Sequence, residues 1–383
     1  MSDALTVRLC GAISEIAKPA WQALLADDQP FVSWDFLHAL EASGSVRSSM
    51  GWRPLHLTLY DGDTLVAAAP MYLKGNSHGE FVFDWAWARA YAEHGRNYYP
   101  KWLCAVPYSP VTGPRLLARS AEHRKALITA MVSEAERLRL SSIHANFLET
   151  DQAALYAHDP WLARFDWQFH WQNRNWRDFQ DFLDSFEAKK RKNESQERRK
   201  VARAGVRIEA LEGSDIDQAL WRELHALYVS TFDDKGNTPA LTRSFFEIFG
   251  VSNPQQIVAF CAYHGGTLIA MALCFKSSTT LYGRYWGAHV EVPGLHFECC
   301  YYQGIDYCLR NGLGRFEPGA QGEHKLARGF LPTRVRSAHW IADADFRRAI
   351  RHSIAEQSAS LRAYGTELQA HSPYRCTPPA AGG

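Results

Sequence analysis

Two strand–turn–strand patterns, one in each half of the chain, constrain the fold more than any other feature of the sequence. In the first half, Pro54–Tyr60 and Leu65–Leu73 flank an Asp-Gly turn. In the second half, Gln256–Tyr263 and Thr267–Phe275 flank a Gly-Gly turn. Such turns between apolar or alternating runs indicate β-hairpins, because glycine adopts the positive φ that a tight turn requires. Each half of the chain is therefore predicted to contain a hairpin.

A long helix and a further strand follow each hairpin. The spacing predicts Ala121–Arg139 and then Ser142–Phe147 in the first half, and Leu295–Arg310 and then Gly314–Glu317 in the second. We expect further helices at Trp34–Ala42, Ile216–Thr231 and Leu241–Phe249, and further strands at Val206–Ala210 and Thr279–Gly287. This order predicts an α/β (α+β) fold with mixed sheets, and we interpret it as a degenerate duplication.

The length of the chain predicts two domains. Its 383 residues exceed the roughly 100–200 residues of one typical domain. We place the N-terminal domain at 1–165 and the C-terminal domain at 166–371, because Asp151–Trp167 reads as irregular. The Pro/Gly-rich segment 372–383 is expected to be a flexible tail.

Composition excludes several classes of protein. Hydrophobic residues make up 46% of the chain, charged residues 22%, and the formal net charge is +1. These values fit a soluble globular protein with no global attraction to nucleic acid or anionic lipid. No stretch reads as a secretory signal or a membrane span. The eight cysteines form no CxxC motif, which favours free thiols and a cytoplasmic location.

A basic segment, Glu187–Arg203, interrupts this neutral background with eight Lys or Arg against three Glu. As a helix it would place Lys192, Gln196, Arg199 and Arg203 on one face. Such a stripe suits phosphate groups of a nucleic acid or substrate. The alternative is a solvated helix with intrahelical ion pairs to Glu194 and Glu197.

A second segment, His296–Phe330, concentrates residues capable of acid–base chemistry. It holds His296, Glu298, Glu317, Glu323, His324, Lys325 and Arg328. Strand ends that face helix N-termini commonly bind ligands, and a carboxylate with an imidazole can act there as base and acid. Structural hydrogen bonding is the main alternative. The spacing matches no standard zinc site, so no metal is expected.

A third segment, Tyr282–Gly287, places an arginine among aromatic rings on a predicted strand. Alternation directs Tyr282, Arg284 and Trp286 to one face and Tyr285 to the other. The arginine could hold a carboxylate or phosphate, or form a cation–π pair in the core.

The first half has its own candidate groove at His78–Lys101, where polar groups and rings alternate without a strict period. Asp84, Tyr98 and Tyr99 are its candidate binding residues. No P-loop, Rossmann fingerprint or nucleophile elbow occurs anywhere in the chain.

These features together resemble the FemAB-like branch of the GNAT acyltransferase superfamily, in particular the bacterial peptidoglycan biosynthesis/recognition N-acyltransferases. Lys189–Val206, Leu281–Gly287 and Phe316–Phe330 carry the resemblance, which extends over nearly the whole chain. It implies two tandem GNAT-like domains of the FemX type and direct transfer of an acyl group to an amine. No covalent enzyme intermediate and no tightly bound cofactor are expected.

The resemblance implies that the acyl donor is a co-substrate, either aminoacyl-tRNA or acyl-CoA. The segment Arg310–Gly314 is one residue short of the CoA-binding signature of GNAT enzymes, and it follows a helix instead of preceding one. This departure favours a donor other than acetyl-CoA. The expected acceptor is a small-molecule or peptide amine, and DNA is not an expected partner.

Site roles follow from the same resemblance and from the residue chemistry. The catalytic candidates are Glu317, His324, Arg284, His296 and Glu298. The substrate-binding candidates are Tyr285, Trp286, Gln321, Lys325, Arg328, Asp84, Tyr98 and Tyr99. The candidates for binding phosphate or tRNA are Lys189, Lys190, Lys192, Arg199 and Arg203.

The alternative function is a non-catalytic recognition protein that binds peptidoglycan precursors or related peptides in an aromatic cleft. Convergence of Glu317, His324 and Arg284 on one pocket would favour the enzyme, and scatter would favour the binding protein.

Overall fold

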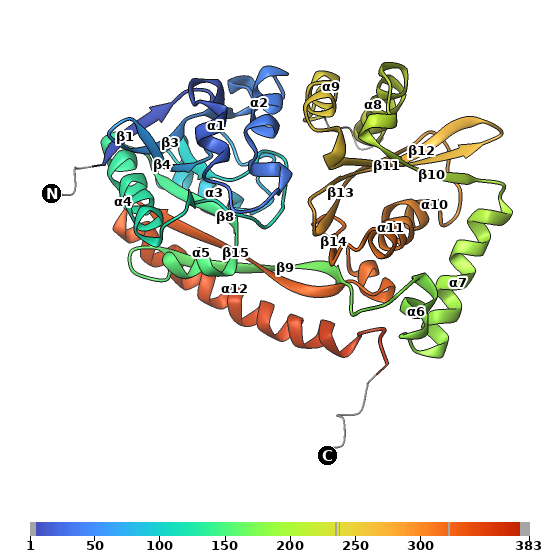
Figure 1. The fold of residues 1–383 in the computed structure, drawn as a ribbon. Coiled ribbons are helices and arrows are strands. Elements are labelled where there is room, and N and C mark those ends of the chain that lie inside the picture. Colours follow the sequence, from blue (N-terminus) through green and yellow to red (C-terminus); the bar gives the residue numbers. More distant parts are fainter. Residues whose placement is uncertain (1–4, 234–235, 237, 321, 376–383) are drawn as a thin grey trace, which may run out of the picture. The chain divides into compact units, whose positions relative to one another are not determined.

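The computed structural model describes residues 5–233, 236, 238–320 and 322–375. These residues form two compact units (Figure 1): unit 1 contains 1–166, 240–252 and 334–362, and unit 2 contains 167–239, 253–333 and 363–383, as far as these residues are described. The first change of unit, at 166/167, lies next to the boundary expected from the sequence. The segments 240–252 and 334–362 then return to unit 1, so neither unit is one continuous stretch of chain.

Unit 1 contains a four-stranded antiparallel sheet in the order β1-β3-β4-β7. Its strands are β1 (Thr6–Cys10), β3 (His56–Asp61), β4 (Thr64–Ala69) and β7 (Leu117–Ala118). The first expected hairpin is confirmed as β3–β4. The single strand expected over Leu65–Leu73 is wrong, because β4 ends before Pro70, which has no N–H to donate to a ladder. The chain continues as β5 in another sheet.

The second set of strands in unit 1 runs in the order β15-β8-β6-β5-β2. They are β2 (Trp52–Pro54), β5 (Met71–Lys74), β6 (Lys101–Cys104), β8 (Ser142–Leu148) and β15 (Leu331–Ile341). Helix α4 (Ala121–Arg137) begins after Ser120, whose side chain accepts a hydrogen bond from the His123 N–H. Its apolar face shares a buried core with these strands.

The other helices of unit 1 are α1 (Lys18–Gln22), α2 (Trp34–Ala42), α3 (Trp85–Glu93), α5 (Thr150–Leu155), α9 (Arg243–Ser252) and the first part of α12 (Ala344–Ala370). Helix α9 belongs to this unit because its rings pack on α2: the Phe36 and Phe245 ring centroids lie 5.3 Å apart. The expectation that Asp151–Trp167 is irregular is wrong, since α5 and the start of β9 (Leu162–Gln172) occupy it.

Unit 2 contains strands in the order β10-β11-β12-β13-β14-β9. They include β10 (Arg207–Glu212), β11 (Ile257–His264), β12 (Thr267–Lys276), β13 (Thr280–Ala288) and β14 (Arg315–Glu317). All neighbours pair antiparallel except β13 and β14, which are parallel. The second expected hairpin is confirmed as β11–β12.

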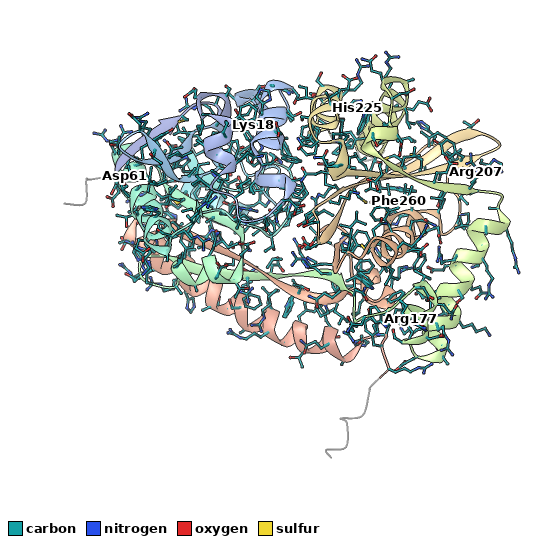
Figure 2. The ribbon with its side chains drawn as sticks, in the orientation of Figure 1. Lys18, Asp61, Arg177, Arg207, His225 and Phe260 are labelled. Atoms are coloured by element: carbon teal, nitrogen blue, oxygen red, sulfur yellow. The ribbon has the colours of Figure 1, made fainter. Side chains whose placement is uncertain are left out.

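Helices cover both faces of this sheet (Figure 1). Helix α8 (Gln218–Asp233) lies on one face, and a continuous helical segment lies on the other: α10 (Leu295–Phe297), a π-helical turn (Glu298–Tyr302) and α11 (Gln303–Asn311). Phe260, on β11 (Figure 2), is buried in the core between sheet and helix, with its ring centroid 6.0 Å from that of Tyr307. The close approach of α8 depends on Gly287, because a Cβ there would lie 1.9 Å from the Leu227 carbonyl oxygen.

The remaining helices of unit 2 are α6 (Phe179–Asp184) and α7 (Ala188–Arg203). Short 3-10 helices in the two units span Ile13–Glu15, Pro30–Val32, Ser48–Met50, Gly213–Asp215, Pro254–Gln256 and Glu323–Arg328.

The expected flexible tail is partly ordered. Tyr374 is buried, its hydroxyl donates to the Gly329 carbonyl at 2.6 Å, and it forms a β-bridge with Phe186. Ring packing and main-chain hydrogen bonds therefore hold the chain as far as Arg375. Residues 376–383 lie outside the described part.

Candidate active site

A cavity in unit 2 forms where β13 and β14 stop pairing. The parallel ladder joins Thr280–Tyr282 to Arg315–Glu317 and ends there, whereas β13 continues to Ala288. On the other side of β13, the register with β12 shifts between Leu273 and Cys274. Because a bulge re-aims side chains and interrupts pairing, this part of β13 is open to a ligand.

The cavity has a volume of about 170 Å³. It is lined by Ala272, Leu273, Cys274, Gly283, Arg284, Tyr285, Trp286, His296, Cys300, Tyr301 and Pro318. The walls therefore come from β12, β13, the helical segment after β13 and the residue after β14. Of the residues expected in the site, Arg284, Tyr285, Trp286 and His296 are brought together here.

Glu317 lies at the end of β14, directly before the cavity residue Pro318. It is 3% exposed, and neither carboxylate oxygen accepts a hydrogen bond from the residues that the structure describes. Arg315 Nε lies 3.3 Å and His170 Nδ1 3.9 Å from Oε1. Burial lowers the pKa of His170, so its ring is mainly neutral at neutral pH. Both carboxylate oxygens are therefore free to accept a hydrogen bond from a ligand.

Lys325 is a second buried charge beside the cavity. It is 2% exposed, and its Nζ donates to the Gly319 carbonyl at 2.8 Å. Burial, followed by repulsion from Arg284, lowers the pKa of Lys325 to about 7. Its ammonium and neutral amine forms are therefore both accessible near neutral pH.

The two candidate histidines are linked to the cavity through Tyr301. The Tyr301 hydroxyl and His324 Nε2 lie 2.8 Å apart, and the His296 ring centroid is 5.6 Å from that of Tyr301. Partial burial, then the charges of Arg328 and Lys325, lower the pKa of His324. A neutral imidazole at neutral pH can relay a proton through the tyrosine hydroxyl.

Glu298 is turned away from the cavity that His296 lines, although both were expected to be catalytic. Two positions along a helix rotate a side chain by about 200°. Its carboxylate pairs with Arg198 at 3.0 Å and accepts from Gln303 Nε2 at 2.8 Å. Both partners line a separate groove beside α7, so the geometry gives Glu298 a structural role.

Arg328 also has a structural partner. Its guanidinium donates to both oxygens of Glu197 at 2.8 and 2.9 Å, and it lies 3.5 Å from the centroid of the Phe297 ring. Glu197 in turn accepts from the Tyr302 hydroxyl at 2.6 Å. Helix α7 is thereby bound to the segment that carries His324 and Lys325.

The basic helix is confirmed as α7, and the predicted stripe is exposed. Lys192, Gln196, Arg199 and Arg203 all face solvent, as do Lys189 and Lys200, while Lys190 is partly buried. The view of α7 as solvated throughout is wrong for Glu194, which is 4% exposed. Burial, opposed by Arg328 and reinforced by Glu197, raises the pKa of Glu194 to about 8.

The candidate residues of the first half lie in unit 1, in a buried network of charges. Asp84 accepts from the Tyr98 hydroxyl at 2.6 Å and pairs with Lys101, whose Nζ also lies 2.8 Å from Glu80 Oε2. The hydroxyl groups of Tyr99 and Ser77 share a hydrogen bond of 2.7 Å. Asp84, Tyr98 and Tyr99 line none of the pockets described in this section.

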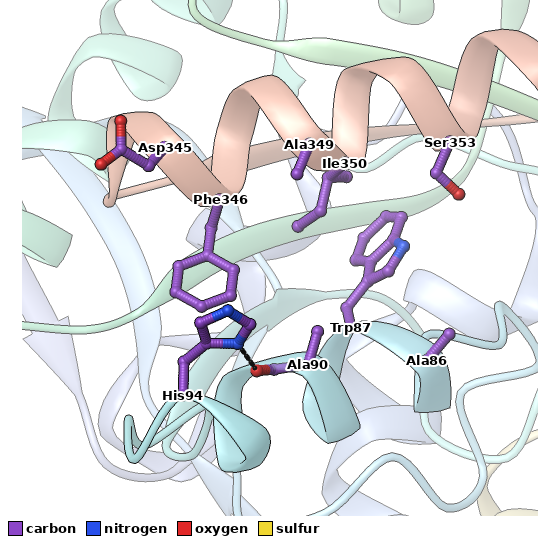
Figure 3. A pocket seen from close by; sticks show the side chains of 9 residues that line it. All are labelled: Ala86, Trp87, Ala90, His94, Asp345, Phe346, Ala349, Ile350 and Ser353. Carbon is purple, nitrogen blue, oxygen red and sulfur yellow. Dashed lines mark hydrogen bonds between the residues drawn. The ribbon is translucent and has the colours of Figure 1, made fainter.

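Unit 1 has a mainly apolar groove of its own, of about 380 Å³ (Figure 3). It lies between α3 and the first part of α12, with Trp87 and Ile350 facing each other across it. The His94 Nδ1–H donates to the Ala90 carbonyl at 2.8 Å. The sequence signals did not single out this groove.

Several residues at the candidate site were not anticipated. Cys300 and Tyr301 line the cavity, and His170 and Arg315 lie closest to Glu317. The tyrosine stands in the segment that the sequence singled out, but His170 comes from β9, which no local pattern joined to β14. Gln321 lies outside the described residues. Among those described, no three His, Cys, Asp or Glu side chains gather as a metal site would require.

Comparison with known proteins agrees with this architecture. Residues 12–376 match the model of the FemAB-like family, described as peptidoglycan biosynthesis/recognition, and the chain belongs to that family. The crystal structure of FemX shares 11% identity and a TM-score of 0.50, over 88% of this chain and 98% of FemX. L-PGS from Bacillus licheniformis shares 11% identity and a TM-score of 0.51, over 83% and 93% of the two chains. No curated protein matches the sequence.

The fold is thus the mixed α/β architecture of FemX, as the sequence predicted. None of the helices in the described part is both long and apolar enough to cross a membrane.

Proposed function

We propose that the protein is an acyltransferase of peptidoglycan metabolism that forms an amide on an amine acceptor. The observation that carries the proposal is Glu317, a buried carboxylate without a hydrogen bond from the described residues, placed where β13 and β14 diverge. Arg284 supplies positive charge beside it, and Lys325 lies near Arg284. A base and cations around one cavity are what acyl transfer to an amine requires.

The residues suggest the following steps. Glu317 accepts a proton from the ammonium group of the acceptor, and the free amine attacks the acyl carbonyl carbon. Arg284 stabilises the negative charge that develops on the carbonyl oxygen, because cations in a water-poor cavity act more strongly than in bulk water. When the carbonyl re-forms, the bond to the donor breaks. The attacking nitrogen loses its second proton to the Tyr301–His324 pair, and the pair passes that proton to the leaving oxygen or sulfur.

Aminoacyl-tRNA is the donor that we favour. The exposed face of α7 presents Lys189, Lys192, Arg199, Lys200 and Arg203 to solvent, and such a stripe fits a phosphate backbone. Arg328 and Glu197 connect this helix to the loop beside the cavity. The poor match of Arg310–Gly314 to the CoA signature points the same way.

A non-catalytic recognition protein remains the second candidate, because the family description includes recognition and aromatic rings line the cavity. Arg284 lines the cavity, Glu317 directly precedes the lining residue Pro318, and His324 contacts the lining residue Tyr301, and this arrangement supports the enzyme.

Mass spectrometry of new amides tests the proposal. Purified protein would be incubated with an extract of cytoplasmic amines and either charged bulk tRNA or a panel of acyl-CoAs. We expect products with charged tRNA only, and loss of these products when Lys192, Arg199 and Arg203 are changed together to Gln. Products with acyl-CoA only would overturn the choice of donor. Absence of product with both donors would support the recognition protein.

A further inference from the structure

Three exposed aromatic side chains lie at alternate positions of one short segment of unit 1. Phe81, Phe83 and Trp85 are 39%, 51% and 41% exposed. The other large hydrophobic side chains exposed on the described residues are three valines, each isolated from the others in sequence. Single exposed apolar residues are ordinary, whereas a cluster marks an interaction surface.

The backbone of this segment is constrained. Phe81 has a φ of +59°, in the left-handed region that bulky residues rarely adopt. Between the exposed rings, Asp84 is buried and bound to Lys101 and Tyr98. The buried anchor fixes the segment, so the rings on either side of it remain at the surface.

The cluster leads directly into the apolar groove between α3 and α12 (Figure 3). Trp85 begins α3, and Ala86, Trp87 and Ala90 on the next turns line the groove. Phe346, Ala349 and Ile350 of α12 form the opposite wall. Residues four positions apart on a helix share a face. Trp85 and Arg89 therefore lie on one face of α3, next to the face on which Ala86 and Ala90 line the groove.

Arginines lie next to groove residues along both helices, and the one carboxylate that lines the groove, Asp345, is paired with Arg348. Arg89 on α3 is exposed, and Arg347 on α12 is partly exposed. Within the residues that the structure describes, neither has a carboxylate within ion-pair distance, whereas Arg96 and Arg348 are paired with Asp343 and Asp345. Unpaired guanidinium groups beside exposed aromatic rings match a phospholipid surface, where phosphates lie directly above apolar chains.

We propose that Phe81, Phe83, Trp85 and the α3–α12 groove form a docking surface for an anionic phospholipid membrane. The rings enter the boundary between headgroups and acyl chains, and an acyl chain occupies the groove. Arg89 and Arg347 contact lipid phosphates. The association is peripheral and reversible, and it is independent of the acyl-transfer proposal because unit 2 contributes no residue to it.

Vesicle co-sedimentation of the full chain tests this surface. The probes are vesicles of phosphatidylglycerol and vesicles of phosphatidylcholine alone. We expect binding to phosphatidylglycerol that weakens with added salt, because surface charges are screened. Changing Phe81, Phe83 and Trp85 together to Ser should weaken it by at least about tenfold. Changing Arg89 and Arg347 to Gln should abolish the preference for phosphatidylglycerol.

The matched control replaces three exposed valines, Val7, Val251 and Val290, by Ser. This variant removes apolar surface elsewhere and should bind vesicles as the unchanged chain does. Thermal unfolding of each variant shows whether it is folded, and bilayer depth is read independently from quenching of tryptophan fluorescence by brominated lipids. Equal binding of the aromatic variant and the unchanged chain would overturn the proposal. The proposal would also be overturned if the aromatic variant lost an oligomeric state of the protein but kept its lipid binding.

Discussion

Arg328 and Glu197 bind the basic helix α7 to the loop that follows β14. The guanidinium of Arg328 donates to both carboxylate oxygens, and its other face rests on Phe297. Because Arg328 is buried and Glu197 only partly so, the pair couples an exposed phosphate-binding candidate to the segment that carries the buried Lys325 and the exposed His324. A single ion pair therefore links the exposed face of α7 to the segment beside the cavity.

Loss of this ion pair should destabilise unit 2. Glu197→Ala leaves the guanidinium of Arg328 buried without its carboxylate, which we expect to lower the free energy of unfolding by about 1–3 kcal/mol. Urea unfolding measures it. Gln196→Ala, at the exposed neighbouring position, is the control and should change stability by less than about 0.5 kcal/mol. Equal effects of the two substitutions would contradict the structural role of the pair.

Glu317→Gln should abolish turnover without unfolding the protein. The amide keeps the size of the carboxylate but cannot accept the proton of the acceptor amine, so the rate of amide formation should fall by about 100-fold or more. Initial rates with the donor found in the mass-spectrometric screen provide the measurement. Glu291→Gln, at an exposed acidic residue after β13, should retain its rate. An unchanged rate for Glu317→Gln would remove this residue from the mechanism.

Glu194 should make folding depend on pH. Burial raises its pKa to about 8 in the folded chain, against an ordinary value near 4.5. The folded state therefore binds a proton that the unfolded state releases, and stability from this group is full below about pH 4.5 and is lost as the pH rises through about 8.

Glu194→Gln removes that dependence. The variant should be more stable than the unchanged chain at pH 8, by roughly 1–3 kcal/mol, and similar to it at about pH 4. Thermal unfolding of both chains at several pH values compares them. A constant difference across this pH range would show that the carboxyl group does not titrate in the way proposed.

The buried charges of unit 1 should be essential for its stability. Lys101 pairs with Glu80 and Asp84. Burial by itself would raise the pKa of Asp84, but the charge of Lys101 outweighs burial and the pKa falls to about 2. Lys101→Met would leave the two carboxylates without their common partner, at a cost of about 3–5 kcal/mol. Lys125→Met, on an exposed position of α4, is the matched control. Unfolding midpoints close to each other for both variants would contradict the prediction.

Local sequence signals predicted the elements that local interactions stabilise. Both hairpins form around their glycine turns. Helix α7 ends at Arg203, which is also the last residue of the predicted basic helix. Turn chemistry and helical periodicity act over a few residues, so they can be read without knowing the fold. The same periodicity separates Glu298 from His296, because residues two positions apart on a helix point to different faces.

Other features depended on contacts between distant parts of the chain. No local pattern assigns α9 to unit 1, because its rings pack on Phe36, more than 200 residues earlier. The same holds for Glu194, which reads as a surface acid in its charged segment but is buried against Arg328.

The sequence by itself determined which chemical groups this protein has, where its hairpins turn and which helix is basic, since these follow from residue type and short-range spacing. Tertiary structure alone decided which of those groups meet. Arg284 and Glu317 come together because β13 and β14 pair in parallel for three residues and then separate. Strand pairing depends on the packing of the whole sheet, and that information is absent from any short stretch of sequence.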